Sequence, residues 1–201
     1  MNANEKEKIV LGSGTDYCME FEGDIPADAE IETEENRLGA IKGGASLTYK
    51  PSTYTEKDDS GKFSKTVTTE EELTYKLGLI TYNANVLDKL VSTGTVTEET
   101  VNGVKRRTIK IGGVENDNGK KWLHRFVHKD PVDGDVRVTI VGTNKSGFSL
   151  AFAKDKGTIV EPEITAEPLD DEGHLVIYTE DVISTDTADA SSQSGDDSEE
   201  D

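Results

Sequence analysis

Alternation of apolar and polar residues at a period of two is the feature that most constrains this chain. In the segment LTYKLGLIT, one face of an extended strand carries four apolar side chains: Leu73, Tyr75, Leu77 and Leu79. Five further segments are interpreted as strands, namely RTIKI, WLHRFVH, VRVTIV, FSLAFA and HLVIY. Hairpin signals lie between them at Asn102-Gly103, Asn118-Gly119, Asp133-Gly134 and 144–147. We therefore predict a mostly β chain, with an antiparallel meander from about 95 to 165.

One short helix is expected among the strands. The segment NANVLDKLVSTG offers Asn83 or Asn85 as the N-cap, and Gly94 is placed to end the helix in the left-handed conformation. A helix over 84–92 is too short to be stable alone in water, so its apolar stripe must pack on the sheets. The expected architecture is two packed antiparallel sheets, forming a β-sandwich or partly closed barrel with this helix at its flank, a long hairpin loop and extended arms.

Charge divides the chain into three parts. The 201 residues include 22 Lys and Arg against 41 Asp and Glu, a net charge of −19. Residues 180–201 hold nine acidic and no basic residues and are predicted to be a disordered acidic tail. Residues 1–44 are interpreted as an N-terminal arm with the first strands, where 12–44 lies outside the compact unit. Residues 45–179 form the predicted β-domain, including a polar loop at 51–64.

Catalytic and ligand-binding patterns do not emerge from the residues. Cys18 has no basic or His partner near it in sequence, which favours a small buried residue over a nucleophile. His124 and His128 lie on a strand pattern roughly 13 Å apart, too far to share one metal ion. The net negative charge argues against tight binding of nucleic acid, and no apolar run is long enough to span a bilayer. We expect no enzyme activity, no cofactor, no metal site and no membrane association.

Three segments together carry a resemblance to a known family: NRLGAIKGGASLTYKPSTYTEKDD, EEELTYKLGLITYNANVLDKL and GFSLAFAKDKGTIVEPEITAEPLDDEGHLVIY. In this order and spacing, from about Leu11 to Tyr178, the chain resembles phage tail tube proteins, the major tail proteins of tailed phages. The resemblance implies two packed sheets, partly closed into a barrel, with one helix beside them. It also implies that six copies close into a ring through a continuous intersubunit sheet and that the rings stack into a hollow tube.

The same resemblance implies partners and a location. Genomic DNA passes through the lumen of such a tube during ejection without being tightly bound, and the chain's negative charge suits that role. Tail terminator, tape measure and baseplate or distal tail proteins are the other implied partners. The expected location is the virion tail, assembled in the cytoplasm of the bacterial host.

Two groups of residues are candidates for contacts between subunits. The loop at 51–64 is expected to touch the neighbouring ring, and its candidate contact residues are Tyr54, Glu56, Lys57, Asp58, Asp59, Lys62 and Phe63. The basic cluster after the Asn-Gly turn is either a solvated strand or a contact with an acidic neighbouring subunit, and comprises Lys105, Arg106 and Arg107.

The sequence is also compatible with three alternative functions. One is the tube protein of a phage-derived contractile injection particle. Another is a monomeric β-sandwich binding module, such as a carbohydrate-binding domain. That class favours two or three exposed aromatic residues on one sheet face, and this chain has a single Trp. A β-barrel enzyme is the last alternative.

Overall fold

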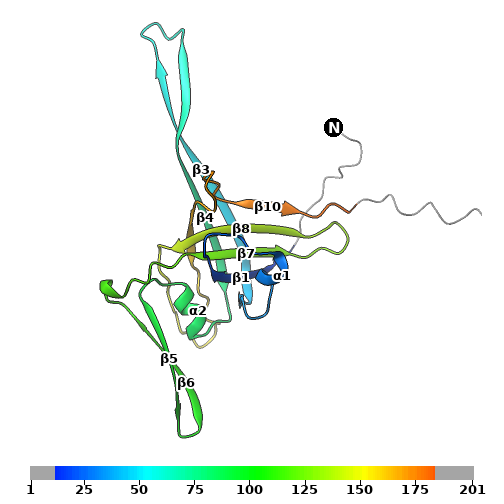
Figure 1. Ribbon diagram of the computed structural model, residues 1–201, viewed down its shortest axis with the longest axis vertical. Helices are drawn as coiled ribbons and strands as arrows, with labels where there is room; N and C mark the ends of the chain where they lie inside the picture. Colours follow the sequence, from blue (N-terminus) through cyan, green and yellow to red (C-terminus); the bar gives the residue numbers. More distant parts are fainter. Residues whose placement is uncertain (1–11, 184–201) are drawn as a thin grey trace, which may run out of the picture.

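The computed structural model describes residues 12–183, which are mostly β as the alternation predicted (Figure 1). Eight strands form one antiparallel sheet, two form a separate hairpin, and two short helices accompany them. The strands are β1 (Thr15–Glu20), β2 (Arg37–Gly39), β3 (Ile41–Lys57), β4 (Ser64–Leu79), β5 (Gly94–Val101), β6 (Val104–Ile111), β7 (Trp122–His128), β8 (Val136–Asn144), β9 (Glu163–Glu167) and β10 (Ile177–Glu180). The helices are α1 (Asp28–Ile31) and α2 (Ala84–Lys89), and a 3-10 turn, η1, spans Val114–Asn116.

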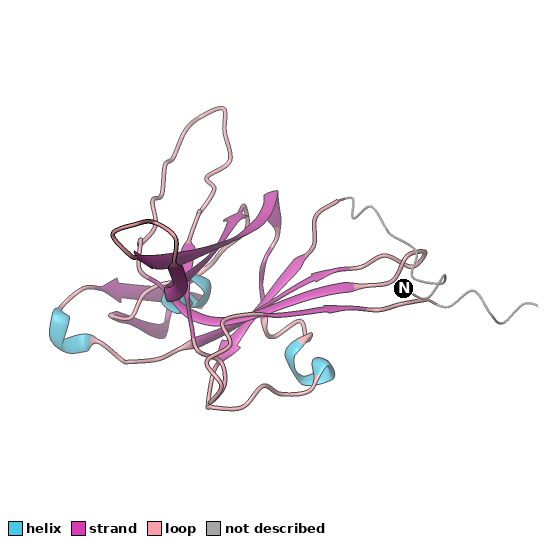
Figure 2. Ribbon diagram, turned by 90° about the horizontal axis from the view of Figure 1, so that it is seen from above, coloured by secondary structure: helices cyan, strands magenta, loops and turns pink. Residues whose placement is uncertain are grey.

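The large sheet forks at β8. Its main strand order is β2-β1-β7-β8-β9-β4-β3, with β10 added on β8. One edge of β8 pairs with β7, whereas the other edge pairs with β10 over residues 136–139 and with β9 over 141–144. Figure 2 shows strands running out from the middle of the molecule in several directions. No closed barrel forms within residues 12–183, and the edge strands of the main order are β2 and β3.

Apolar side chains form a cluster on each side of the central strands. The larger cluster contains the predicted face of β4, all of it buried, and the stripe of α2 that packs against it. The smaller cluster joins Tyr17, Leu123 and Val141 to Ile31 of α1. Because successive residues of a strand point to opposite faces, Tyr17 and its neighbour Cys18 enter different clusters. The central strands are therefore buried on both faces.

Helix α2 begins as predicted and ends earlier. The Asn83 side chain caps it, accepting hydrogen bonds at 2.9 and 3.1 Å from two backbone N–H groups of the first turn. The last helical residue is Lys89, three residues before the predicted end. The predicted role of Gly94 is wrong, because this residue starts β5 and is not among those with positive φ. A Cβ at this position would collide with the side chains of Asp88 and Val91, so a larger residue there would have to displace them.

The predicted polar loop at 51–64 is wrong in extent. Strand β3 continues to Lys57 and β4 begins at Ser64, so the connection is only a short turn at 58–63. The backbone pairs across the two strands, and the hydroxyls of Thr55 and Thr66 lie 2.8 Å apart. Thr, Tyr and Val favour extended backbone. Both faces of this part meet solvent, so the alternation that reveals half-buried strands is missing.

The expected strand FSLAFA is also wrong, because residues 147–153 lie outside any strand. A strand at this position would have to pair with the edge of β8 that faces away from β7, and β9 already occupies that edge. The Asn144 side chain, at the end of β8, donates hydrogen bonds to the carbonyls of Leu90 and Gly147 and turns the chain away. Phe148 packs against the core from this loop, whereas Phe152 is 80% exposed.

The N-terminal arm and the start of the acidic tail both contribute more to the fold than expected. Strand β1 pairs with β7 along its whole length, so residues 12–44 do not lie outside the compact unit. At the other end, β10 includes Glu180, and the Asp181 carboxylate lies 2.9 Å from the Arg137 guanidinium. The boundary of the predicted tail at residue 180 is therefore wrong, and its remainder at 184–201 lies outside the described residues.

Candidate functional site

The most prominent surface feature is the hairpin formed by β3 and β4. Residues 46–72 are exposed without interruption, so this part has solvent on both faces. In Figure 1 it extends far from the rest of the molecule. A two-stranded hairpin is at best marginally stable in water unless another surface supports it. The outer hairpin is therefore a candidate contact surface, and it contains every residue proposed above for contacts between rings.

The turn at the end of the hairpin is internally ordered. The Asp58 carboxylate accepts a hydrogen bond at 2.7 Å from the backbone N–H of Phe63 and another from the Ser60 hydroxyl. These bonds, with that of Ser60 the stronger influence, lower the pKa of Asp58. Asp58 thus shapes the turn itself, whereas Lys57, Asp59 and other candidates around it present exposed side chains.

Apolar and aromatic side chains remain uncovered along this hairpin. Tyr54 is 55% exposed, Phe63 is 75% exposed, and Val67 lies directly across from Tyr54. The Tyr54 hydroxyl donates to Glu56, which raises the pKa of the tyrosine. Leu47 and Tyr49, nearer the body, are also exposed. Aromatic side chains with a polar end are typical anchors of protein interfaces.

The basic cluster of the second hairpin is paired within that hairpin. Strands β5 and β6 place Glu98 opposite Arg107, and Glu98 binds both Arg107 and Lys105, the latter at 2.6 Å. Hydrogen bonds from Lys105 and Arg107 lower the pKa of Glu98. Arg106 lies 3.9 Å from Glu99. The structure thus gives all three basic residues acidic partners in their own chain, as expected for a solvated strand.

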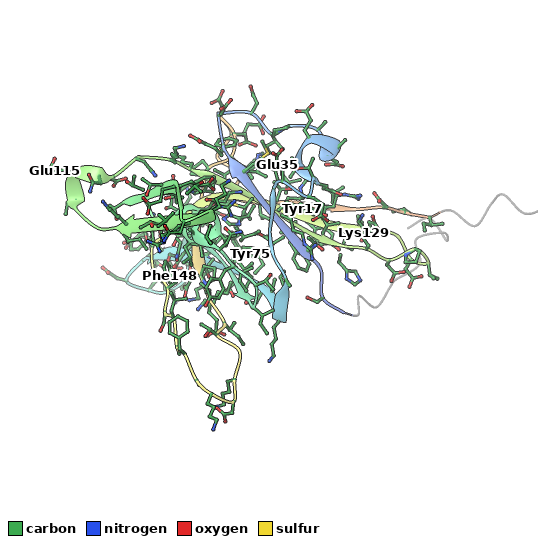
Figure 3. All side chains as sticks on the ribbon, turned by 90° about the horizontal axis from the view of Figure 1, so that it is seen from below. Tyr17, Glu35, Tyr75, Glu115, Lys129 and Phe148 are labelled. Carbon is green, nitrogen blue, oxygen red and sulfur yellow. The ribbon has the colours of Figure 1, made fainter. Side chains whose placement is uncertain are left out.

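A buried polar cluster joins strands β1, β4 and β7. The Asp16 carboxylate accepts a hydrogen bond at 2.8 Å from the Tyr75 hydroxyl, and its other oxygen lies 3.1 Å from His124 Nδ1. On the far side of the imidazole, Nε2 lies 3.9 Å from Cys18 Sγ. Figure 3 shows Tyr75 near the middle of the molecule. Sequence reasoning missed this arrangement, because Cys18 and His124 are 106 positions apart.

The neighbours of His124 favour the protonated form of its imidazole. Burial alone lowers the pKa of His124, but the acidic groups of Cys18 and Asp16 outweigh it and raise this pKa to about 10. Burial, together with the neighbouring Asp16 carboxylate, raises the pKa of Tyr75 well above its usual value. A Cys–His–Asp order is found in nucleophilic catalysis. Here the Cys18 side chain is fully buried, and the hydrogen bonds of Asp16 connect β1 with β4 and β7 inside the fold.

His128, the other histidine considered in the sequence analysis, is not part of this cluster. Its Nδ1 lies 2.8 Å from the carbonyl oxygen of Ser13. Within residues 12–183, no three His, Cys, Asp or Glu side chains are grouped so as to hold a metal ion. None of the described helices has the length and apolar character needed to cross a membrane.

The chain matches no model of a protein family, and no curated protein matches it.

Proposed function

We propose that this chain is the structural subunit of a phage tail tube. Six copies form a ring, and rings stack into a hollow tube that conducts DNA during ejection. The resemblance of the three sequence segments supports this role. The observation that carries the proposal is the outer β3–β4 hairpin, which extends into solvent at residues 46–72 with its aromatic side chains uncovered.

The hairpin supports assembly for a physical reason. Backbone hydrogen bonds within the hairpin are satisfied, but its side chains lack a buried face in a single copy. A neighbouring ring that covers Tyr54 and Phe63 supplies the apolar burial that stabilises such a hairpin. Charged residues around the turn then face partly desolvated partners, where ion pairs contribute more than they do in open solvent.

The edge strands of the main sheet support the association of copies around a ring. Strand β3 is the last strand of the main order, with 17 residues, and β2 is last at the opposite end. Unpaired edge strands promote association unless another chain or element covers them. Pairing between copies in a closed ring removes such edges, and rotational symmetry satisfies every copy in the same way.

Electron microscopy of the purified full-length chain tests the proposal. Negatively stained samples at rising protein concentration are expected to contain six-fold rings and then tubes. A protein that stays monomeric at high concentration, with and without a tail-tip protein to start assembly, contradicts the proposal and favours a binding module.

A further inference from the structure

A groove lies beside the only tryptophan of the chain, at the end of α2. Its volume is about 460 Å³, and its walls come from the end of α2, the segment leading into β7, and the ends of β8 and β9. The residues that matter for its chemistry are Lys89, Lys120, Lys121, Trp122, Lys145 and Glu167. The groove contains none of the residues proposed above for contacts between rings.

The charge of this groove is opposite to that of the chain. Its lining holds four lysines against two acidic residues, Asp117 and Glu167, whereas the whole chain has a net charge of −19. Lys120 binds Glu20 at 2.6 Å, and Glu167 lies 2.9 Å from Lys121 and 3.9 Å from Lys145. With Glu20 included, four lysines face three carboxylates, which leaves a net charge of +1 at the groove.

The lysines are arranged around an aromatic ring. The ammonium of Lys89 lies 5.7 Å from the centre of the Trp122 ring, and that of Lys120 lies 6.0 Å from it. Lys89 also donates to the backbone carbonyl of Cys18, an uncharged partner. Two cations next to one indole provide both electrostatic attraction for an anionic chain and a flat apolar surface for its side chains.

One segment of this chain has the complementary chemistry. Residues 184–201 contain seven acidic residues and no Lys or Arg, and the acidic positions are Asp186, Asp189, Asp196, Asp197, Glu199, Glu200 and Asp201. We propose that this acidic segment of one copy docks in the lysine-lined groove beside Trp122 of another copy. This contact goes beyond the proposed tube contacts and does not require that the copies form rings.

The direction of β10 favours an occupant from another copy. Glu180, the last residue of β10, pairs with Val136 at the start of β8, whereas the groove lies at Thr143 to Lys145 near the other end. In Figure 1, β10 runs toward the side of the molecule away from α2. The chain thus leaves the sheet heading away from its own groove, and must reverse over about 26 Å, the length of β8, to return.

Trp122 provides a direct readout, because it is the single tryptophan. The test uses a full-length variant in which the seven acidic residues of 184–201 are changed to Asn or Gln. Adding a synthetic peptide of residues 180–201 to this variant is expected to change the Trp122 fluorescence saturably, and less strongly at high salt. A peptide with the same neutralising changes serves as the negative control. The titration is run at protein concentrations where electron microscopy shows no assembly, so its result is independent of the tube proposal.

Matched lysine variants locate the binding. Lys120→Gln with Lys145→Gln, in the neutral-tail background, is expected to weaken peptide binding about fivefold, the effect of losing two exposed charge contacts. Lys154→Gln with Lys156→Gln removes the same charge from an exposed loop outside the groove and should leave binding unchanged. Equal weakening by both pairs overturns the proposal, since it indicates attraction by overall charge.

Two further outcomes also overturn it. In the unmodified chain, docking between copies makes the Trp122 signal depend on protein concentration. If the unmodified chain shows the Trp122 fluorescence of the peptide-bound state and this does not change on dilution, the segment fills the groove of its own copy. Tighter binding of a short single-stranded oligonucleotide than of the peptide assigns the groove to nucleic acid instead.

Discussion

The Asp16 carboxylate and the His124 imidazole face each other across β1 and β7, with Oδ2 and Nδ1 3.1 Å apart and both side chains essentially inaccessible to water. Removing two charges from water is costly, and the cost is offset only when each has good partners. Asp16 has a second partner in the Tyr75 hydroxyl. A slip of one residue between β1 and β7 turns Asp16 to the opposite face of the sheet and breaks both bonds. The pair therefore fixes the register of β1.

Replacing His124 with Leu should destabilise the protein strongly. Asp16 then remains buried without its charged partner, and we expect the free energy of unfolding to fall by about 3 kcal/mol. Urea unfolding measures this loss as a lower midpoint at unchanged slope. The double variant Asp16→Asn, His124→Leu removes both charges and should recover part of the loss. If the double variant is less stable than His124→Leu alone, the loss in the single variant does not come from leaving Asp16 without its partner.

The same pair predicts a loss of stability at alkaline pH. His124 has a pKa of about 10 in the folded protein against an ordinary value of 6.5, so the folded state binds the proton more tightly. Its stabilising effect is complete below about pH 6.5 and is lost as the pH rises toward about 10. The difference in urea midpoint between the parent and the double variant Asp16→Asn, His124→Leu should shrink as the pH rises across this range. A stability difference that stays constant with pH argues against a protonated His124.

The sequence predicts those strands in which apolar side chains recur at a period of two. The face of β4 that begins at Leu73 is buried as expected, because it packs on α2 while Lys76 points to solvent. The N-cap of α2 at Asn83 was also predictable, since a cap depends on only three or four adjacent residues.

The features that the sequence did not predict depend on contacts between distant segments or on the absence of a buried face. Asp16 and His124 are 108 positions apart, and only the pairing of β1 with β7 brings them together. The sole local signal was His124 itself, a polar residue on the strand face that also carries Trp122 and Phe126. The outer hairpin was interpreted as a loop because, with solvent on both faces, Thr55 and Thr66 follow no hydrophobic period.

Replacing Gly142 with Ala should disturb the fork of the sheet. A Cβ at Gly142 would collide with the backbone carbonyl of Thr165 on β9, and that backbone is fixed by its pairing with β8. We expect a loss of about 2 kcal/mol, as for other overpacked sites. Gly157→Ala is the matched control, because its Cβ has only the end of the Ile80 side chain nearby, at 3.4 Å. Its effect should stay within about 0.5 kcal/mol. Similar losses for both variants in urea unfolding contradict this interpretation of Gly142.

Shortening the long hairpin should separate folding from assembly. Ser52 and Glu70 lie opposite each other on β3 and β4, so an Asn-Gly turn can join them in place of residues 53–69. All the removed residues are exposed, and we expect the free energy of unfolding to change by no more than about 0.5 kcal/mol. Electron microscopy of the shortened chain, in parallel with the parent, should show rings that do not lengthen into tubes.

A second hairpin variant distinguishes the length of the hairpin from its aromatic contacts. Tyr54→Ser with Phe63→Ser keeps every backbone pair of the hairpin but removes the apolar area that a neighbouring ring is expected to cover. Tube growth should therefore fail in this variant as it does in the shortened one, whereas Lys50→Gln, on the exposed stem of β3, should leave it unchanged. Normal tubes from the double Ser variant combined with none from the shortened chain assign the contact to the rest of the hairpin, namely its backbone or the charged side chains around its turn. Normal tubes from both variants place the stacking surface elsewhere on the molecule.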